Sequence, residues 1–142
     1  MARTKTTVEN LDKAIRKILD QYGEITWKNV DEATKKVAKK TRLAVANGSQ
    51  QFNGHGHWGK GAYSRGWRVK EDRGLWWSSY IVHQANKPYE THLLEYGHEL
   101  DGVYNGVPQS GRARAFPHIA PVAEKVPDEM QKEVVDAIRA SS

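Results

Sequence analysis

A helical repeat of apolar residues occupies the first third of the chain and limits what it can fold into. The spacing alternates between three and four residues at Val8, Leu11, Ile15, Ile18, Tyr22 and Ile25. Such spacing places the side chains on one face of an α-helix. A second stripe follows Gly23, at Val30, Ala33, Val37, Ala44 and Val45. We predict two helices or one kinked helix, with Thr7 as N-cap and a C-terminal cap at Asn47 and Gly48.

The stretch from Gly48 to Gly61 is predicted to be an exposed loop. It is rich in Gly, Gln, Asn and His, and it offers little that can pack in a core. We expect this loop to be disordered in an isolated subunit and ordered only in an assembled particle.

A Trp-rich hairpin is predicted next. Trp67 and Val69 alternate with Arg68 and Lys70, and residues 75–83 are rich in aromatic and β-branched side chains. Both patterns are typical of strands. Residues 71–74 end in glycine and are the expected turn.

The rest of the chain is predicted to contain a short and a longer helix. Asn86, Lys87 and Pro88 break the second strand, and residues 91–98 form a helical turn closed by Gly97. Residues 101–114 are expected to be a loop and residues 116–121 an extended link. An amphipathic helix then runs from Val122 to Ala140, with Pro127 or Asp128 as its alternative start.

These elements predict an α+β fold in a single domain spanning residues 1–142. A long, possibly kinked N-terminal helix precedes a small antiparallel sheet with a Trp-rich hairpin, and the C-terminal helix is packed on the sheet. The chain has no cysteine, which excludes disulfides, thiolate metal sites and cysteine nucleophiles. No stretch approaches the roughly 20 apolar residues of a membrane span, and we expect no signal peptide.

Sequence motifs of catalysis are not found. His55 and His57 have a spacing that suits a metal, and His92 and Glu95 share a helical face, but neither pair belongs to an H-E-x-x-H motif. The chain also lacks a G-x-S-x-G nucleophile turn and a phosphate-binding loop. We therefore expect no enzyme activity and no cofactor, and a small metal-dependent enzyme is a third alternative.

Two sequence blocks carry a resemblance to a known family. One is Pro88-Tyr89-Glu90-Thr91-His92-Leu93-Leu94-Glu95-Tyr96-Gly97-His98, and the other is Phe116-Pro117-His118-Ile119-Ala120-Pro121. The chain resembles the siphophage tail-completion family, which are head–tail connector (neck) proteins of the gene-product-ten type. The family motif residues are His92, Leu93, Leu94, Glu95, Gly97, His98, Pro117, His118, Ile119 and Pro121. The loop at residues 102–111 is longer than the turn that the resemblance implies.

This resemblance implies a structural virion protein without catalysis. It implies a homo-oligomeric ring at the junction of head and tail, made in the cytoplasm of a bacterial host by a phage or prophage. The implied partners are head-closure and tail-terminator proteins, with DNA passing through the lumen and no membrane. The alternative is a nucleic-acid-binding protein that uses a basic helix and exposed Trp residues.

Physical arguments give the motif a structural role. Leu93 and Leu94 are expected to anchor a helical turn to the sheet, and Gly97 permits a chain reversal. Pro117 and Pro121 keep the link extended. Glu95 is expected to form a hydrogen bond between the two blocks, with either His98 or His118.

Charge is distributed unevenly along the chain. Residues 1–88 contain 17 Lys and Arg against 8 Asp and Glu, whereas residues 89–142 contain 5 against 9. In a cyclic ring two different surfaces meet, so basic and acidic parts of neighbouring subunits are expected to pair. The candidates are Lys35, Lys36, Lys39 and Lys40 on one side and Glu124, Asp128, Glu129 and Glu133 on the other.

Overall fold

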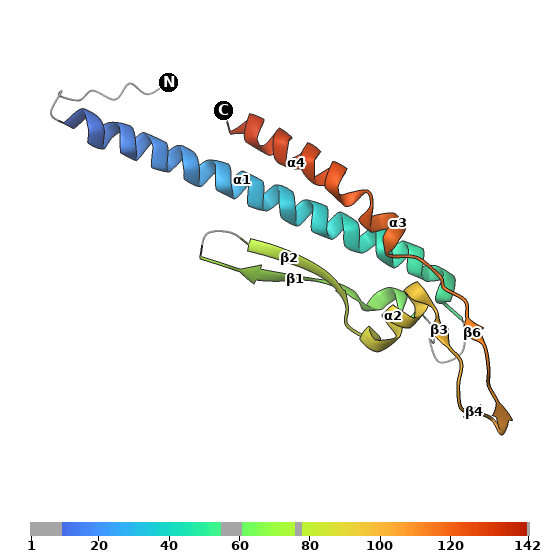
Figure 1. Cartoon of the computed structure of the whole chain (residues 1–142). Coiled ribbons are helices and arrows are strands. Elements are labelled where there is room, and N and C mark those ends of the chain that lie inside the picture. The colour runs from blue at the N-terminus through green and yellow to red at the C-terminus, as the bar shows by residue number, and fades with distance from the viewer. Residues whose placement is uncertain (1–9, 55–60, 76–77, 142) are drawn as a thin grey trace.

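One long helix organises the molecule (Figure 1). The computed structural model describes residues 10–54, 61–75 and 78–141, and Thr7, the expected N-cap, lies outside them. Helix α1 (Leu11–Gly48) continues through Gly23 without interruption, so of the two predicted alternatives the single long helix is confirmed and the two separate helices are not. The predicted glycine cap is also wrong, because Gly48 has a right-handed helical φ of −62° and leads directly into a 3₁₀ helix.

That 3₁₀ helix, η2 (Ser49–Phe52), corrects the prediction of an exposed loop from Gly48 to Gly61. Ser49 and Phe52 are buried. The Ser49 hydroxyl donates to the Val45 carbonyl at 2.7 Å and accepts from the Trp67 indole N–H at 2.8 Å. These partners let a polar residue enter the core, which composition alone does not reveal. Residues 55–60 of the predicted loop lie outside the described part of the chain.

A second 3₁₀ helix, η4 (Ser64–Gly66), leads into an antiparallel hairpin of β1 (Trp67–Arg73) and β2 (Ser78–Gln84). Trp67 faces Gln84, and Arg73 faces Ser78. The turn predicted at residues 71–74 is therefore three residues too early. Glu71 and Arg73 are exposed and form an ion pair of 3.1 Å, so these charged residues extend the strand without being buried.

Helix α2 (Pro88–Tyr96) ends at Gly97 as predicted, and an extended arm follows. Strand β3 (His98–Glu99) pairs with β6 (Arg112–Ala113), and β4 (Val103–Tyr104) pairs with β5 (Val107–Pro108). Backbone hydrogen bonds of 2.8 Å join Leu100 to Gly111 and Gln109 to Gly102 between the two ladders. The predicted loop is thus a β-hairpin, here called the arm (residues 98–113).

The chain returns along α1 through two helices. Helix α3 (Ala120–Ala123) is short, and α4 (Val126–Ala140) runs antiparallel to α1, with Pro127 in its first turn. Asn29 donates to the Ser141 hydroxyl at 2.7 Å at one end of this contact, and Lys40 lies near Glu129 at the other. The prediction that the C-terminal helix packs on the sheet is wrong, because α1 lies between α4 and the β1–β2 hairpin (Figure 1).

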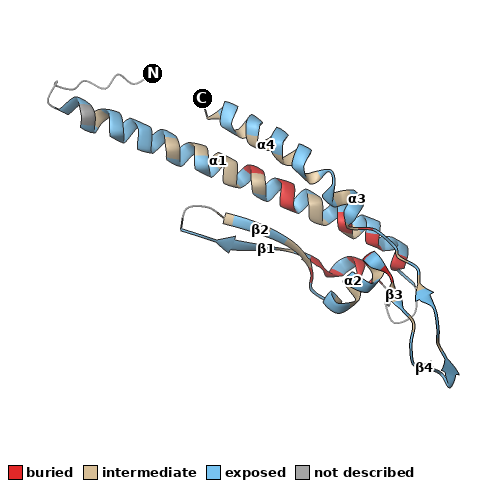
Figure 2. Cartoon of the chain, in the orientation of Figure 1, coloured by how far each residue is buried: buried red, intermediate tan, exposed pale blue. Residues whose placement is uncertain are grey.

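The core sits at the C-terminal end of α1. Its centre is a cluster of four buried side chains, to which partly buried apolar groups add: Val45, Phe52, Tyr63 and Trp67, with Ala46, Val82, Leu94, Ile119 and Val122 around them. Figure 2 shows buried positions concentrated there, while the N-terminal half of α1 is exposed. The α+β class is confirmed, and the strands of the described residues form three separate two-stranded sheets.

Candidate functional site

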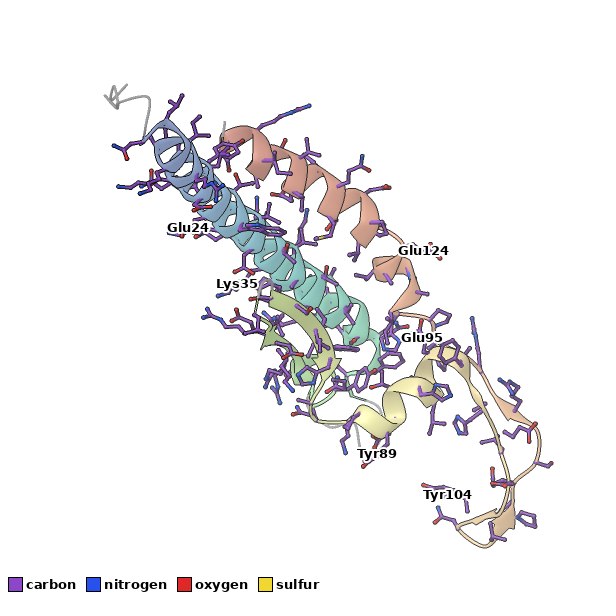
Figure 3. The ribbon with its side chains drawn as sticks, turned by 60° about the vertical axis from the view of Figure 1, so that its left-hand side comes forward. Glu24, Lys35, Tyr89, Glu95, Tyr104 and Glu124 are labelled. Atoms are coloured by element: carbon purple, nitrogen blue, oxygen red, sulfur yellow. The ribbon has the colours of Figure 1, made fainter. Side chains whose placement is uncertain are left out.

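The carboxylate of Glu95 joins the two sequence blocks. Glu95 lies in the last turn of α2 and is buried. Its Oε2 accepts the backbone N–H groups of His118 at 2.9 Å and Ile119 at 3.0 Å, and its Oε1 accepts that of Ala120 at 2.9 Å. We call this arrangement the Glu95 clasp; Figure 3 shows Glu95 near the place where α2, the link and the end of α1 meet. The predicted bond across the blocks is confirmed, with His118 as the partner.

The imidazole of His118 extends the clasp into the core. Its Nδ1 is 2.8 Å from the Phe116 carbonyl and 3.1 Å from Glu95 Oε2. Both of these atoms are acceptors, so Nδ1 carries a proton. Its Nε2 is 2.8 Å from the Tyr63 hydroxyl, which in turn is 3.3 Å from the Thr91 hydroxyl. Three segments that are distant in sequence are therefore held by one hydrogen-bonded network.

The network shifts the pKa of two of its members. Burial by itself raises the pKa of Glu95, but the three backbone N–H donors and the nearby His118 outweigh it, so the pKa of Glu95 lies below its usual value. Burial raises the pKa of Tyr63 to about 12, although the hydrogen bond with Thr91 opposes this. Near neutral pH, Glu95 is therefore an anion and Tyr63 a neutral phenol.

A carboxylate, an imidazole and a hydroxyl in this order resemble the relay of an acid–base catalyst. Access argues against that role, because Tyr63, His118 and Glu95 expose only 0%, 3% and 6% of their surface. A phenol with a pKa near 12 is also a poor nucleophile at neutral pH. The arrangement is suited to holding the link and α3 against α2.

The other motif residues occupy different surroundings. Leu94 packs against the core cluster as expected, but Leu93 is exposed and does not anchor α2 to the sheet. Leu93 instead lines an apolar groove at the base of the arm with His98 and Phe116. His98 has a buried Nδ1 with no hydrogen-bond partner. The remaining exposed motif residues are His92, Pro117 and Pro121.

Gly97 occupies a position that only glycine fits. Its φ is +72°, and a Cβ there would lie 2.5 Å from the backbone oxygen of Ala113. The residue is thus required both for the turn out of α2 and for the close approach of strand β6.

The charged residues predicted to pair between subunits are partly used within the chain. Lys36 Nζ is 3.0 Å from Glu133 Oε2, and Lys40 Nζ is 3.7 Å from Glu129 Oε1. The hydrogen bond from Lys36 lowers the pKa of Glu133. Four of the eight candidates therefore connect α1 to α4, and the other four are exposed: Lys35, Lys39, Glu124 and Asp128.

The described part of the chain leaves an apolar stripe on α1 uncovered. Five side chains of the predicted helical repeat are 46% to 54% exposed: Leu11, Ile15, Ile18, Tyr22 and Ile25. The same spacing leads from Ile25 to Asn29, where the end of α4 lies. These five residues, here called the α1 stripe, therefore continue the face of α1 that α4 covers.

The end of the arm is a second uncovered apolar surface. Val103, Tyr104 and Val107, here called the arm tip, are 58% to 70% exposed. The turn between β4 and β5 is Asn105-Gly106, with φ values of 49° and 77°. Asn-Gly between apolar pairs is a strong hairpin signal that could have predicted the arm. In Figure 3, Glu24 on α1 and Tyr104 lie at opposite ends of the molecule.

The described residues contain no group of three His, Asp or Glu side chains placed to hold a metal ion. His55 and His57 lie outside that part of the chain. Within the same residues, none of the helices is long and apolar enough to cross a membrane. Comparison of the chain with protein-family models, curated proteins and solved structures found no match.

Proposed function

We propose that the chain is a structural subunit of the bacteriophage head–tail junction, of the tail-completion class, and works in a homo-oligomeric ring rather than as an enzyme. The resemblance of residues 88–98 and 116–121 supports the class. The single observation that carries the proposal is the pair of uncovered apolar surfaces, the α1 stripe and the arm tip.

Both surfaces are unfavourable in a subunit that stays alone. Residues 11–28 of α1 extend beyond the end of α4. Helices in proteins gain most of their stability from packing of an amphipathic face, which this part of α1 lacks on its stripe. Contiguous apolar surface on a water-soluble protein commonly marks an interaction site. A subunit that becomes covered on assembly accounts for both features.

The Glu95 clasp fits this role because it fixes geometry. It ties α2, from which the arm extends, to the link that leads into α3 and α4. A ring forms reproducibly only when each subunit presents its contact surfaces at a constant angle. The proposed neighbours are further copies, head-closure and tail-terminator proteins, and DNA in the lumen.

Removal of the gene from the phage or prophage that carries it tests the proposal. We expect full heads and complete tails to accumulate separately, and the chain to be detected by mass spectrometry in wild-type virions. Two results would contradict the assignment: infectious particles formed after deletion of the gene, or wild-type virions in which the protein is not detected.

Nucleic-acid binding is the alternative, which the exposed Lys35 and Lys39 favour. The buried Trp67 and the ion-paired Lys36 and Lys40 are less available for it. A binder with six to ten phosphate contacts loses about 10³–10⁵ in affinity between roughly 50 and 200 mM salt. A titration of DNA binding against salt therefore distinguishes the two functions.

A further inference from the structure

We infer that the arm tip of one subunit packs on the α1 stripe of the next copy of the chain. The inference rests on the proposed function only in taking the subunit to assemble with itself. It names the two surfaces that meet, neither of which the described part of one chain covers.

The α1 stripe has the width and composition of a helix face that packs against another element. It extends from Leu11 to Ile25, a length of about 21 Å. Its borders are uncharged, with Ala14 and Gln21 along one side and Leu19 and Thr26 along the other. The apolar arc is therefore wide, like that of a helix packed in a core. The opposite face carries the charges, so it is the stripe that needs a partner.

The arm tip has the matching chemistry. Residues 102–111 contain no charged side chain. In the β4–β5 ladder Tyr104 faces Val107, so these two side chains share one face of the ribbon. A lone two-stranded hairpin is at best marginally stable in water. Packing of this face on an apolar surface would stabilise the hairpin.

One chain cannot make this contact with itself. The arm extends from α2, which packs at the C-terminal end of α1 near Gly48 and His118. The distance along α1 from Ile25 to Gly48 is about 34 Å. The arm points away from the stripe, as Figure 1 shows. The partner is therefore another molecule.

A second copy is favoured over a different protein because one contact then covers both surfaces. Two different surfaces at opposite ends of one chain define a head-to-tail contact, which is the kind that a ring requires.

The absence of cysteine makes the test simple, because engineered thiols have no competitors. The variants Ile18→Cys on the stripe and Val107→Cys on the packing face of the arm tip are purified separately, mixed and oxidised. We expect a disulfide between the two variants and little within either one. Lys17→Cys, one residue away but off the stripe, replaces Ile18→Cys as the control and should cross-link much less with Val107→Cys.

Other outcomes overturn the contact. Cross-links of Ile18→Cys with itself would show that stripe packs on stripe, and cross-links of Val107→Cys with itself would show that arm packs on arm. No cross-link above the Lys17→Cys control, at the highest soluble concentration, would also overturn it. The outcome of this test does not depend on the phage assignment. A cross-link can form even if virions lack the protein, and virions can contain the protein even if no cross-link forms.

A second measurement guards against cysteine-specific effects. Ile18→Asp and Tyr104→Asp replace exposed side chains, so the thermal unfolding of the monomer should change little. Each variant should reduce self-association at least tenfold in sedimentation experiments. Unchanged association of both folded variants would overturn the inference.

Discussion

The carboxylate of Glu95 takes the place of an N-cap for α3. The N-cap residue of that helix, Ile119, has no side chain that accepts hydrogen bonds, and no side-chain cap bond is formed from within the segment. Glu95 supplies the acceptors from α2 instead. The first N–H groups of a helix otherwise need water or a local polar side chain. One residue therefore satisfies N–H groups at the start of α3 and also joins α3 to α2.

Replacement of this carboxylate should destabilise the subunit. Glu95→Gln puts an amide N–H₂ among backbone donors, and an unsatisfied buried donor costs about 1–3 kcal/mol. We expect a loss of that size in chemical unfolding near neutral pH. Glu99→Gln, on the exposed arm, is the matched control and should have little effect. Equal stability of the two variants would mean that the clasp does not hold the fold together.

The same residue predicts an acid dependence. The pKa of Glu95 is lower in the folded chain than its ordinary value of 4.5, so the folded state favours the anion. Its contribution to the free energy of unfolding is complete above about pH 4.5 and is lost as the pH falls through the lowered pKa. The wild type should lose more stability on acidification than Glu95→Gln, as unfolding measured across a pH series would show.

Tyr63 predicts the opposite dependence at alkaline pH. Its pKa of about 12 in the folded chain exceeds the ordinary 10.0, so its contribution is complete below pH 10 and is lost as the pH rises toward 12. Tyr63→Phe should remove that part of the alkaline loss. Tyr80, whose pKa is also about 12, needs the parallel variant Tyr80→Phe. An alkaline profile that Tyr63→Phe leaves unchanged would show that the phenol ionises without unfolding.

Among the elements, the arm depends on one glycine. Gly97→Ala adds a Cβ that would lie 2.5 Å from the backbone oxygen of Ala113, at a φ of +72°. Gly102 has a φ of +84° with open space around it, so Gly102→Ala meets the backbone strain without the clash. Such strain costs about 1–3 kcal/mol. We expect Gly97→Ala to lose more stability and to speed amide exchange at the base of the arm, and equal effects would argue against the clash.

Sequence patterns predicted the elements whose signals are local. The repeat in α1, the glycine after α2 and the proline in the first turn of α4 were all read correctly. The predictions are wrong where tertiary contacts, and not the local sequence, determine which residues are buried. Ser49 and Phe52 are polar-flanked and looked exposed, yet the indole of Trp67 and the packing around Tyr63 bury them.

The sequence predicts the hydrogen bond of Glu95 but leaves open which of two histidines is its partner. The sequence predicts that Glu95 bonds between the blocks, with either His98 or His118, and the structure selects His118. The role of Tyr63 was not anticipated, since 55 residues separate it from His118 and no periodic pattern links them. The arm was missed although Asn105-Gly106 marks its turn.

At the scale of the whole molecule, the lysines of α1 divide into two pairs. All four are exposed, and Lys36 and Lys40 also reach glutamates of α4. Reversing Lys36 and Lys40 to Glu should weaken the α1–α4 contact, and exposed pairs of this kind contribute about 0.2–1 kcal/mol each. Reversing Lys35 and Lys39 leaves the two α1–α4 ion pairs in place, so it should lower monomer stability less; it removes the Lys35 charge that helps to lower the pKa of Glu71.

The reversal of Lys35 and Lys39 tests whether ion pairs also hold neighbouring subunits together. If Lys35 and Lys39 meet Glu124 and Asp128 of a neighbour, their reversal reduces assembly, and reversing both acids as well partly restores it. Added salt should loosen the wild-type assembly, because it screens exposed charges. Native mass spectrometry across the variants measures both effects. Assembly like that of the wild type would leave these lysines as a solvated face.

The long separation in sequence between contacting segments also determines the order in which the chain can fold during synthesis. During synthesis α1 is complete long before His118 exists, and the bond from Asn29 to Ser141 joins residues 112 positions apart. Contacts between such distant segments form late, since a large loop has to close first. The nascent chain therefore carries a long, uncovered amphipathic helix for almost the whole of translation. Such a chain exposes apolar surface to which chaperones bind. A chain that ends before residue 118 lacks His118, Ile119 and Val122, which complete the packing around the core cluster.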